Sequence, residues 1–392
     1  MEKLNNSTAW QYSNEAGKFR RKYIFELSQI MKFICFAALL CCQRVEATPY
    51  THDRESVNII LFIGDGMSLA QWQTGMIMSD DSLHIERMST VGIVQTNPLT
   101  DFNGDAPSHG TAIATGVCTR KGAVGIDAEG KPLKTLMDYA KENRIATGIV
   151  SANSLMEGSL APFIAHVENR MQLEDIAKAY VDEEVDVFIG GGIQYFTNRK
   201  DGKDFIPELS RKGYQITRSK EELQHVNGNK LAGFIGASAE CNTSQGSGVS
   251  LPFYVQTAIN LLSRNDRGFL LLIDDVHIDR ASHAKNTKQI GAETIYFDKA
   301  IGVALEFAKK EKNTLVIAVG GPEASGMVLV GGNIQNQVVE AEWVKTGMIH
   351  TGTMVPIFSD GFGAERFQGI MKNTDLFFRL KEVMLSPNTK NF

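Results

Sequence analysis

Short runs of apolar, often β-branched residues alternate along the chain with longer segments whose apolar positions recur every three or four residues. The short runs are typical of strands, and the longer segments are typical of amphipathic helices. The pattern predicts strands over residues 57–63, 147–151, 185–189, 269–273, 314–319 and 355–358. It predicts helices over residues 134–143, 173–181, 253–263 and 287–310.

Continuous apolar strands separated by helices indicate a mainly parallel sheet with helices on both faces. The expected fold class is therefore α/β, with a central mixed, mainly parallel sheet. Residues 227–250 are rich in Gly, Asn and Ser and are expected to form a surface excursion. There is no internal repeat or convincing linker, so we expect a single domain over residues 48–392.

Composition and charge exclude some classes of protein. The 392 residues are 43% hydrophobic and 22% charged, which is ordinary for a globular chain. The net charge is −5, and the main body of the chain has no run of Lys and Arg, so a nucleic-acid surface is not expected. No apolar run reaches the roughly 18 residues that a membrane-spanning helix requires.

The N-terminal region has the pattern of a secretory signal peptide. Lys32 is followed by an apolar stretch over residues 33–42, and Ala47 ends an A-x-A-like cleavage site. Residues 1–47 are therefore interpreted as an upstream extension plus signal peptide, with Met31 as the expected start and a periplasmic or secreted mature chain. A long basic leader before the apolar stretch, or a lipoprotein signal, are the alternatives.

The cysteines of the predicted mature chain allow at most one disulfide. Three of the five lie in the signal segment, which leaves Cys118 and Cys241. An oxidising compartment allows them to pair, but the sequence does not show whether they do.

Several chemically capable side chains follow the predicted strands. Ligands of open α/β sheets collect at the carboxyl ends of the strands, where Asp65 and Asp274 lie. Asp279 and His283 are four residues apart, so one helical turn would place both on the same face. A carboxylate and an imidazole in this arrangement suit zinc or another divalent ion, and His350 is a further candidate ligand.

Five ordered motifs resemble the alkaline phosphatase family. They are "NIILFIGDGM", "TAIATGVCTRKGAVGIDAEGKPLKTL", "DVFIGGGIQYF", "GFLLLIDDVHIDRASHA" and "HTGTMVPIFSDGFGAERF", and the likeness covers about residues 57–385. The resemblance implies the central mixed sheet of that family, flanked by helices. The short span between Gly326 and His350 implies a reduced form of the insertion that larger members carry.

The resemblance also implies two zinc ions and one magnesium ion around a serine nucleophile. Asp279, His283 and His350 match the first zinc site. Asp65 and Ser159 match the magnesium site, and Asp274 stands there where the family usually has Glu. Arg170 matches the arginine that clamps the phosphate, and a planar guanidinium suits a phosphoryl group.

Three departures fall on one functional unit. The family pattern places Asp-Ser ten residues before Thr-Gly, and here that spacing lands on Asp105 and Ala106. The second zinc site takes Asp-His just before Glu, and here those positions hold Gly321 and Pro322. Ser108 and His109 are not expected to substitute for the nucleophile, because two or three residues of helix turn the side chain roughly 200–300° away.

Three hypotheses follow. The chain is an exported phosphate monoester hydrolase by descent with strongly impaired activity, or a non-catalytic periplasmic pseudoenzyme that binds metal and phosphate. A third hypothesis is altered chemistry, in which a single zinc activates water directly against an ester. The expected cofactors are Zn and Mg, the expected partner is a phosphate ester or inorganic phosphate, and the resemblance leaves a homodimer open.

Overall fold

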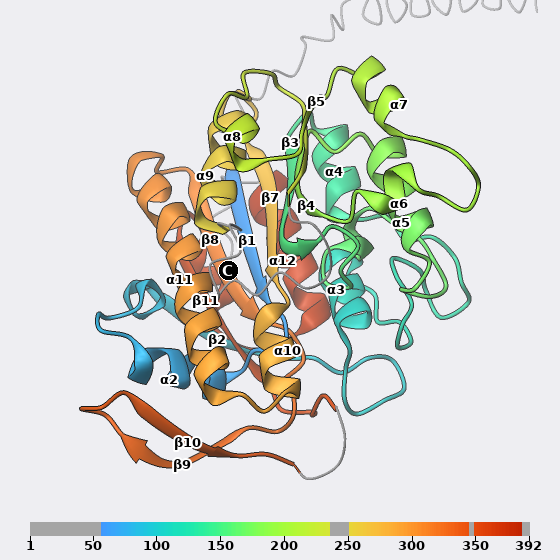
Figure 1. Ribbon diagram of the computed structural model, residues 1–392. Coiled ribbons are helices and arrows are strands. Elements are labelled where there is room, and N and C mark those ends of the chain that lie inside the picture. The colour runs from blue at the N-terminus through green and yellow to red at the C-terminus, as the bar shows by residue number, and fades with distance from the viewer. Residues whose placement is uncertain (1–55, 236–250, 345–348, 386–392) are drawn as a thin grey trace, which may run out of the picture. The chain divides into compact units, whose positions relative to one another are not determined.

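A ten-stranded mixed sheet forms the centre of the protein (Figure 1). The computed structural model describes residues 56–235, 251–344 and 349–385. The strands of this sheet are β1 (Asn58–Gly64), β2 (Thr90–Gln95), β3 (Ala146–Ser154), β4 (Val187–Gly191), β5 (Gln215–Thr217), β6 (Leu231–Phe234), β7 (Phe269–Asp275), β8 (Thr314–Gly320), β11 (Val355–Gly361) and β12 (Gly369–Lys372).

The strand order is β12-β2-β11-β8-β1-β7-β3-β4-β6-β5. All pairings are parallel except those that β11 makes with β2 and β8. The central strands are in register at their carboxyl ends, because Gly64 pairs with both Asp275 and Gly320. The predicted fold class, a mixed and mainly parallel sheet, is confirmed.

Helices cover both faces of the sheet, as the alternation of strands and helices predicts (Figure 1). The helices are α2 (Leu69–Met78), α3 (Ala106–Thr115), α4 (Leu136–Glu142), α5 (Leu173–Asp182), α6 (Gln194–Thr197), α7 (Ile206–Arg211), α8 (Lys220–Leu223), α9 (Leu251–Leu262), α10 (His277–His283), α11 (Thr287–Lys310) and α12 (Asn373–Leu385). Short 3-10 turns occur at η1 (His84–Arg87), η2 (Ala161–Phe163) and η4 (Ala364–Phe367).

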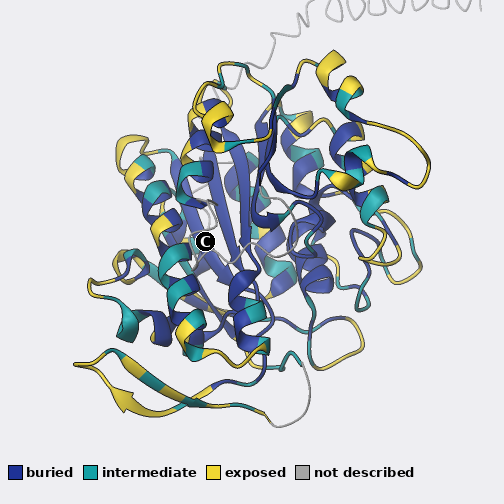
Figure 2. Cartoon of the chain, viewed as in Figure 1, coloured by how far each residue is buried: buried dark blue, intermediate teal, exposed yellow. Residues whose placement is uncertain are grey.

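Successive residues of the central strands point to opposite faces and enter two separate cores. On β7, Leu270 and Leu272 pack with the core under α3, α4, α5 and α12, whereas Leu271 and Ile273 pack with the core under α2, α9 and α11. Every residue of β1, β7 and β8 is buried (Figure 2). Burial on both faces explains why these strands are continuous apolar runs in the sequence.

The predicted elements agree with the structure to within a few residues. All six predicted strands and all four predicted helices are present, and the helix predicted over residues 287–310 has those bounds. The prediction of a surface excursion over residues 227–250 is wrong at its start. Leu231–Phe234 form the buried strand β6, because the partners β4 and β5 supply the hydrogen bonds that local composition does not reveal. Residues 236–250 lie outside the described residues.

A separate antiparallel hairpin, β9 (Val328–Asn333) and β10 (Val338–Glu342), occupies part of the short span between Gly326 and His350. It lies beside α2 and the lower end of α11 in Figure 1. Residues 1–47, predicted to be an extension and signal peptide, lie outside the described residues. None of the described helices is both long and apolar enough to cross a membrane.

Candidate active site

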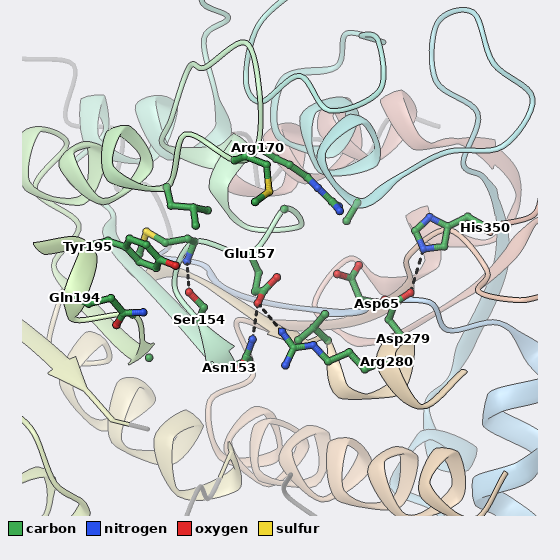
Figure 3. Close-up of a pocket in the computed structure, with 18 residues that line it drawn as sticks. Asp65, Asn153, Ser154, Glu157, Arg170, Gln194, Tyr195, Asp279, Arg280 and His350 are labelled. Atoms are coloured by element: carbon green, nitrogen blue, oxygen red, sulfur yellow. Dashed lines mark hydrogen bonds and ion pairs between the residues drawn. The ribbon is translucent and has the colours of Figure 1, made fainter. Parts of the chain in front are cut away.

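A cavity of about 330 Å³ opens at the carboxyl ends of the central strands (Figure 3). The loops after β1, β3 and β7 supply most of its charged lining, as expected for an open α/β sheet. Asp279 and His350 lie at one end of the view in Figure 3, and Gln194 and Tyr195 lie at the other. Its charged lining residues are Asp65, Glu157, Arg170, Asp279, Arg280 and His350.

Asp279, His283 and His350 form a tight cluster at this edge. Asp279 and His283 are one turn apart on α10, and Asp279 Oδ1 is 3.3 Å from His283 Nε2 and 3.1 Å from His350 Nε2. One possible ligand atom from each side chain lies within 4.8 Å of the others. The predicted grouping of the three side chains is therefore present in the fold.

Hydrogen bonds outside the cluster orient both imidazoles. His350 Nδ1 is 3.2 Å from the carbonyl oxygen of Gly104, and His283 Nδ1 is 3.2 Å from Ser325 Oγ. Both Nε2 atoms therefore face Asp279. Burial acts to raise the pKa of Asp279, but the hydrogen bonds with His283 and His350 outweigh it and hold that pKa at about 2. A permanently charged carboxylate beside two oriented imidazoles is a suitable donor set for zinc.

Asp65 and Ser159 are also brought together. The Ser159 hydroxyl donates a hydrogen bond of 2.6 Å to Asp65 Oδ1. Burial, joined by the negative charge of Asp279, raises the pKa of Asp65 to about 7. A carboxylate that has lost its hydration and stands beside another negative charge is one that a cation would stabilise.

Of the three predicted magnesium ligands, Asp65 lines the cavity, whereas Ser159 and Asp274 are buried and do not line it. Asp274 is the penultimate residue of β7. Burial, with the charge of Glu157 and then of Asp65, raises its pKa well above the usual range. Asp274 is therefore close enough to interact with these two carboxylates.

Glu157 and Arg280 are site residues that the sequence reasoning missed. Arg280 Nη2 lies 3.5 Å from Glu157 Oε1, and Asn153 Nδ2 donates to the same oxygen (Figure 3). Burial raises the pKa of Glu157, and the charges of Arg280 and Arg170 oppose that shift. Two signals were available in the sequence, because Glu157 is two residues before Ser159 and Arg280 follows Asp279.

Arg170 lines the cavity on the side opposite α10 (Figure 3). Its backbone N–H donates to the Gly122 carbonyl at 2.9 Å, which ties it to the loop after α3. The side chain is exposed and so is free to approach an anion from the mouth of the cavity. With Arg280 it gives the cavity two guanidinium groups.

Ala106 presents a methyl group to the same cavity. It is the first residue of α3, and its neighbour Asp105 caps this helix by accepting from the backbone N–H of Ser108 at 3.1 Å. The Ser108 hydroxyl donates back to the carbonyl of Asp105 at 3.2 Å and does not line the cavity. His109 is fully buried, its pKa is lowered to about 4 by burial, and it does not line the cavity.

Gly321 and Pro322 follow β8 directly beside Asp65. The Gly321 N–H donates to the Gly64 carbonyl at 2.8 Å, which continues the pairing of β8 with β1. A Cβ added at Gly321 would lie 2.8 Å from Asp65 Oδ1, so a side chain at this position would meet Asp65. Glu323 is buried and accepts hydrogen bonds from Thr351 Oγ1 and from the backbone after it, so it holds the loop instead of facing the cavity.

The two cysteines of the predicted mature chain differ in what the structure shows. Cys118 is a partly buried free thiol whose pKa is raised by burial. Cys241 lies outside the described residues, so their pairing stays open.

Comparison with known proteins gives a consistent result. The alkaline phosphatase family model matches residues 56–346. The chain is 28% identical over 424 residues to alkaline phosphatase 4 of Bacillus subtilis, covering 87% of this chain and 91% of that protein. It is 28% identical over 409 residues to the Escherichia coli alkaline phosphatase, covering 85% and 87%.

Solved structures agree with these relatives. The alkaline phosphatase of the Antarctic bacterium TAB5 superposes with a TM-score of 0.79 at 30% identity, covering 85% of this chain and all of that one. A mutant of the same enzyme with Mg bound in its M3 site superposes with a TM-score of 0.78 at 29% identity, covering 84% and 98%. Since the family model spans most of the sequence and the solved structure of the TAB5 enzyme shares the fold, the chain belongs to the alkaline phosphatase family.

Proposed function

We propose that this protein binds phosphate esters or inorganic phosphate in the cavity but hydrolyses phosphate monoesters far more slowly than active members of its family. Family members act on phosphate esters. The observation that carries the proposal is Ala106, which lines the cavity at the start of α3 with no hydroxyl to attack phosphorus. Neighbouring Ser108 is held in the helix cap, so its hydroxyl does not replace the missing one.

The residues present fit one zinc ion. Asp279, His283 and His350 offer one carboxylate and two imidazoles, and the hydrogen bonds to Gly104 and Ser325 orient both rings. Three protein ligands with an open fourth position are the arrangement of a catalytic zinc site. Such an ion supplies Lewis-acid stabilisation of the negative charge that develops on a leaving oxygen.

The region around Asp65 fits magnesium less completely. The Ser159 hydroxyl and Asp65 Oδ1 are hydrogen-bonded oxygen donors, and burial, with the repulsion of neighbouring carboxylates, raises the pKa values of Asp65 and Asp274, a shift that a bound cation would oppose. Hard oxygen donors of this kind suit Mg²⁺. We propose that Asp65 and Ser159 would hold this ion. The nearby carboxyl group of Asp274 would add negative charge to the site if it is ionised.

The remaining steps belong to side chains of the chain itself. Arg170, free at the cavity mouth, would bind two non-bridging oxygens of a phosphoryl group through its planar guanidinium. Arg280 is held near Glu157 and would add positive charge on the opposite wall. These groups orient and hold an ester, but binding alone does not lower the barrier to attack.

The attack side of the reaction is what the chain lacks. Ala106 offers no nucleophile, and Gly321 and Pro322 offer no side-chain ligand for a second zinc ion. Groups that act as a unit are strongly non-additive, and the loss of one member costs about 10⁴–10⁶ in rate. We therefore expect residual turnover, if measurable, to be slower than in an active relative by at least this order.

A non-catalytic role in binding metal or phosphate is the second candidate function. The observation in its favour is that the Asp279 cluster and Arg170 are in place while the attacking group is absent. A third scheme, in which one zinc ion activates water against the ester, would need turnover without a phosphorylated protein intermediate.

Hydrolysis of an aryl phosphate at alkaline pH by the zinc-loaded chain, beside an active family member, tests the proposal. We expect phosphate binding with turnover lower by about 10⁴-fold or more. His283→Ala should remove zinc from the Asp279 cluster, because Asp279 and His350 leave too few ligands. Arg170→Ala should weaken phosphate binding while zinc is retained. A family-like rate that Ser108→Ala abolishes would show that Ser108 is the nucleophile and that the proposal is wrong.

We further propose that the protein is exported. The support is the signal-like segment from Met31 to Ala47. The curated relatives reported above are alkaline phosphatases of bacteria.

A further inference from the structure

A second cluster of ligand-type side chains lies on the opposite face of the sheet from Asp274. Asp275 is the last residue of β7, His277 is the first residue of α10, and Glu293 lies in α11. Because successive strand residues alternate between faces, Asp274 points toward the core that contains Tyr180, and Asp275 points toward α11. The cavity described above is lined by none of these three residues.

The three side chains are close and buried. One possible ligand atom from each lies within 4.8 Å of the others. Their exposed fractions are 0% for Asp275, 1% for His277 and 0% for Glu293. Ile278, which follows His277, and Phe297, one helical turn after Glu293, belong to the apolar core on this face of the sheet, so the cluster is shielded from solvent.

The hydrogen bonds leave ligand atoms available. His277 Nδ1–H donates to Asp275 Oδ1 at 2.8 Å, and the backbone N–H of His277 donates to the same oxygen at 2.8 Å. Asp275 Oδ2 and His277 Nε2 are buried without a hydrogen-bond partner among the described residues. A ring whose Nδ1–H is held by a carboxylate presents its Nε2 lone pair, which is how a carboxylate commonly orients a metal-binding imidazole.

The free ligand atoms favour a bound cation over a network of hydrogen bonds among the three side chains. A divalent cation would be bound by His277 Nε2 and Asp275 Oδ2, two buried atoms that the hydrogen bonds of the described residues leave without a partner. Two carboxylates and one imidazole form a donor set that suits Zn²⁺ or Mn²⁺.

We propose that Asp275, His277 and Glu293 hold a divalent transition-metal ion, distinct from any ion at Asp279, His283 and His350. The ion would join β7, α10 and α11, three consecutive elements of the chain. His277 and Asp279 are two residues apart on α10, so their side chains leave the helix roughly 200° apart and serve the two clusters on different sides. The buried ion would therefore fix the helix that carries Asp279 and His283 against α11.

The test uses a full-length double variant, His283→Ala with His350→Ala, which lacks the two imidazoles of the Asp279 cluster. This double variant is called the background. After zinc or manganese loading and dialysis, we expect this background to retain about one ion per chain, as a closed buried site would. X-ray absorption on that ion should show a single imidazole ligand. Adding Glu293→Gln, which keeps the shape of the side chain and removes its charge, should release the ion. Tm measured with and without metal should lose its metal-dependent rise in the same variant.

The outcomes separate this inference from the zinc site of the proposed function. A background that retains no ion overturns the inference. An ion with no imidazole ligand, or one retained unchanged when Glu293→Gln or His277→Gln is added, overturns it as well. If these variants do not fold, as judged by circular dichroism, the ion count and the imidazole count of the background alone still decide. If instead Asp279, His283 and His350 bind no zinc, the parent and the background will contain the same amount of metal.

Discussion

At the residue scale, the proposed loss of activity depends on Ala106, Gly321 and Pro322. Ala106 offers a methyl group at the start of α3, and a Cβ at Gly321 would lie 2.8 Å from Asp65 Oδ1. Gly321 does not adopt the left-handed backbone conformation that excludes other residues, so a side chain here meets crowding and not backbone strain. The adjacent Pro322 offers no donor atom in its side chain.

Repair of the site should be cooperative. Ala106→Ser alone adds a hydroxyl with no metal to lower its pKa, and Gly321→Asp with Pro322→His alone adds ligands with no nucleophile to activate. We expect each partial repair to change aryl-phosphate hydrolysis little. The triple variant should exceed the product of the separate gains by roughly tenfold or more, a coupling of about 1.4 kcal/mol.

All four zinc-loaded proteins are compared at the same pH, with zinc content measured for each. Gains that simply multiply would show that the three positions do not act as a unit. An active parent whose rate the repairs leave unchanged would locate catalysis elsewhere.

His109 makes stability depend on pH. Burial lowers its pKa from 6.5 to about 4, so the unfolded chain binds more protons than the folded chain between these values. This contribution is fully present above pH 6.5 and is lost as the pH falls toward 4. At pH 5 the parent should lose about 2 kcal/mol of unfolding free energy that a His109→Leu variant does not lose.

Urea unfolding of both proteins at pH 7, 6 and 5 checks this expectation. The difference between the two pH profiles is the readout, because the carboxylates titrate alike in both. Parallel profiles would contradict a depressed pKa for His109.

At the element scale, the turn after β1 and the first turns of α10 are packed tightly together. Gly66 has a φ of +67°, and a Cβ there would lie 2.7 Å from both Cα and Oδ1 of Asp279. The backbone N–H of Asp65 donates to the Asp275 carbonyl at 3.1 Å, which joins the same two segments. The position of Asp279 therefore depends on the absence of a side chain at Gly66.

Gly66→Ala should displace α10 as well as strain the turn. Gly122 is a matched control, because its φ is +77° and a Cβ there would meet nothing within 4 Å. Each substitution should cost about 1–2 kcal/mol for the left-handed conformation, and Gly66→Ala should cost at least roughly 1 kcal/mol more because of the contact.

Urea unfolding and zinc retention are measured for both variants. Only Gly66→Ala should weaken zinc binding, since only it presses on Asp279. If both variants lose the same stability and retain the same amount of zinc, α10 can shift to accommodate the new Cβ without a change in zinc binding at Asp279.

At the scale of the whole molecule, the signal-like segment predicts where the mature chain begins. Lys32, the apolar stretch over residues 33–42 and Ala47 form its pattern. The native protein should begin at Thr48 and be recovered from the periplasm or the medium, as judged by N-terminal mass analysis. Detection of residues before Met31 in the mature protein would refute this prediction.

Much of the fold could be predicted because its signals are local. The buried runs of β1, β7 and β8, and the long helix α11, are each visible as hydrophobic patterns within one segment of the chain. The pairing of Asp279 with His283 follows from helical spacing alone, whereas the assignment of Ala106 to the nucleophile position rests on the resemblance to the family and stays a prediction. Local periodicity and short spacing survive in any fold that keeps the element, so the sequence alone determines them.

Contacts between distant segments were decided only by the tertiary structure. Ser159 meets Asp65 across 94 positions, and strand β6 exists because β4 and β5 flank it. The Glu157–Arg280 contact and the meeting of Glu293 with Asp275 likewise join loops or helices with no shared pattern. These arrangements depend on strand order and on which face each residue takes. In a sheet with another strand order, the same local sequence would place these side chains differently. The packing of the two cores selects the strand order that is observed.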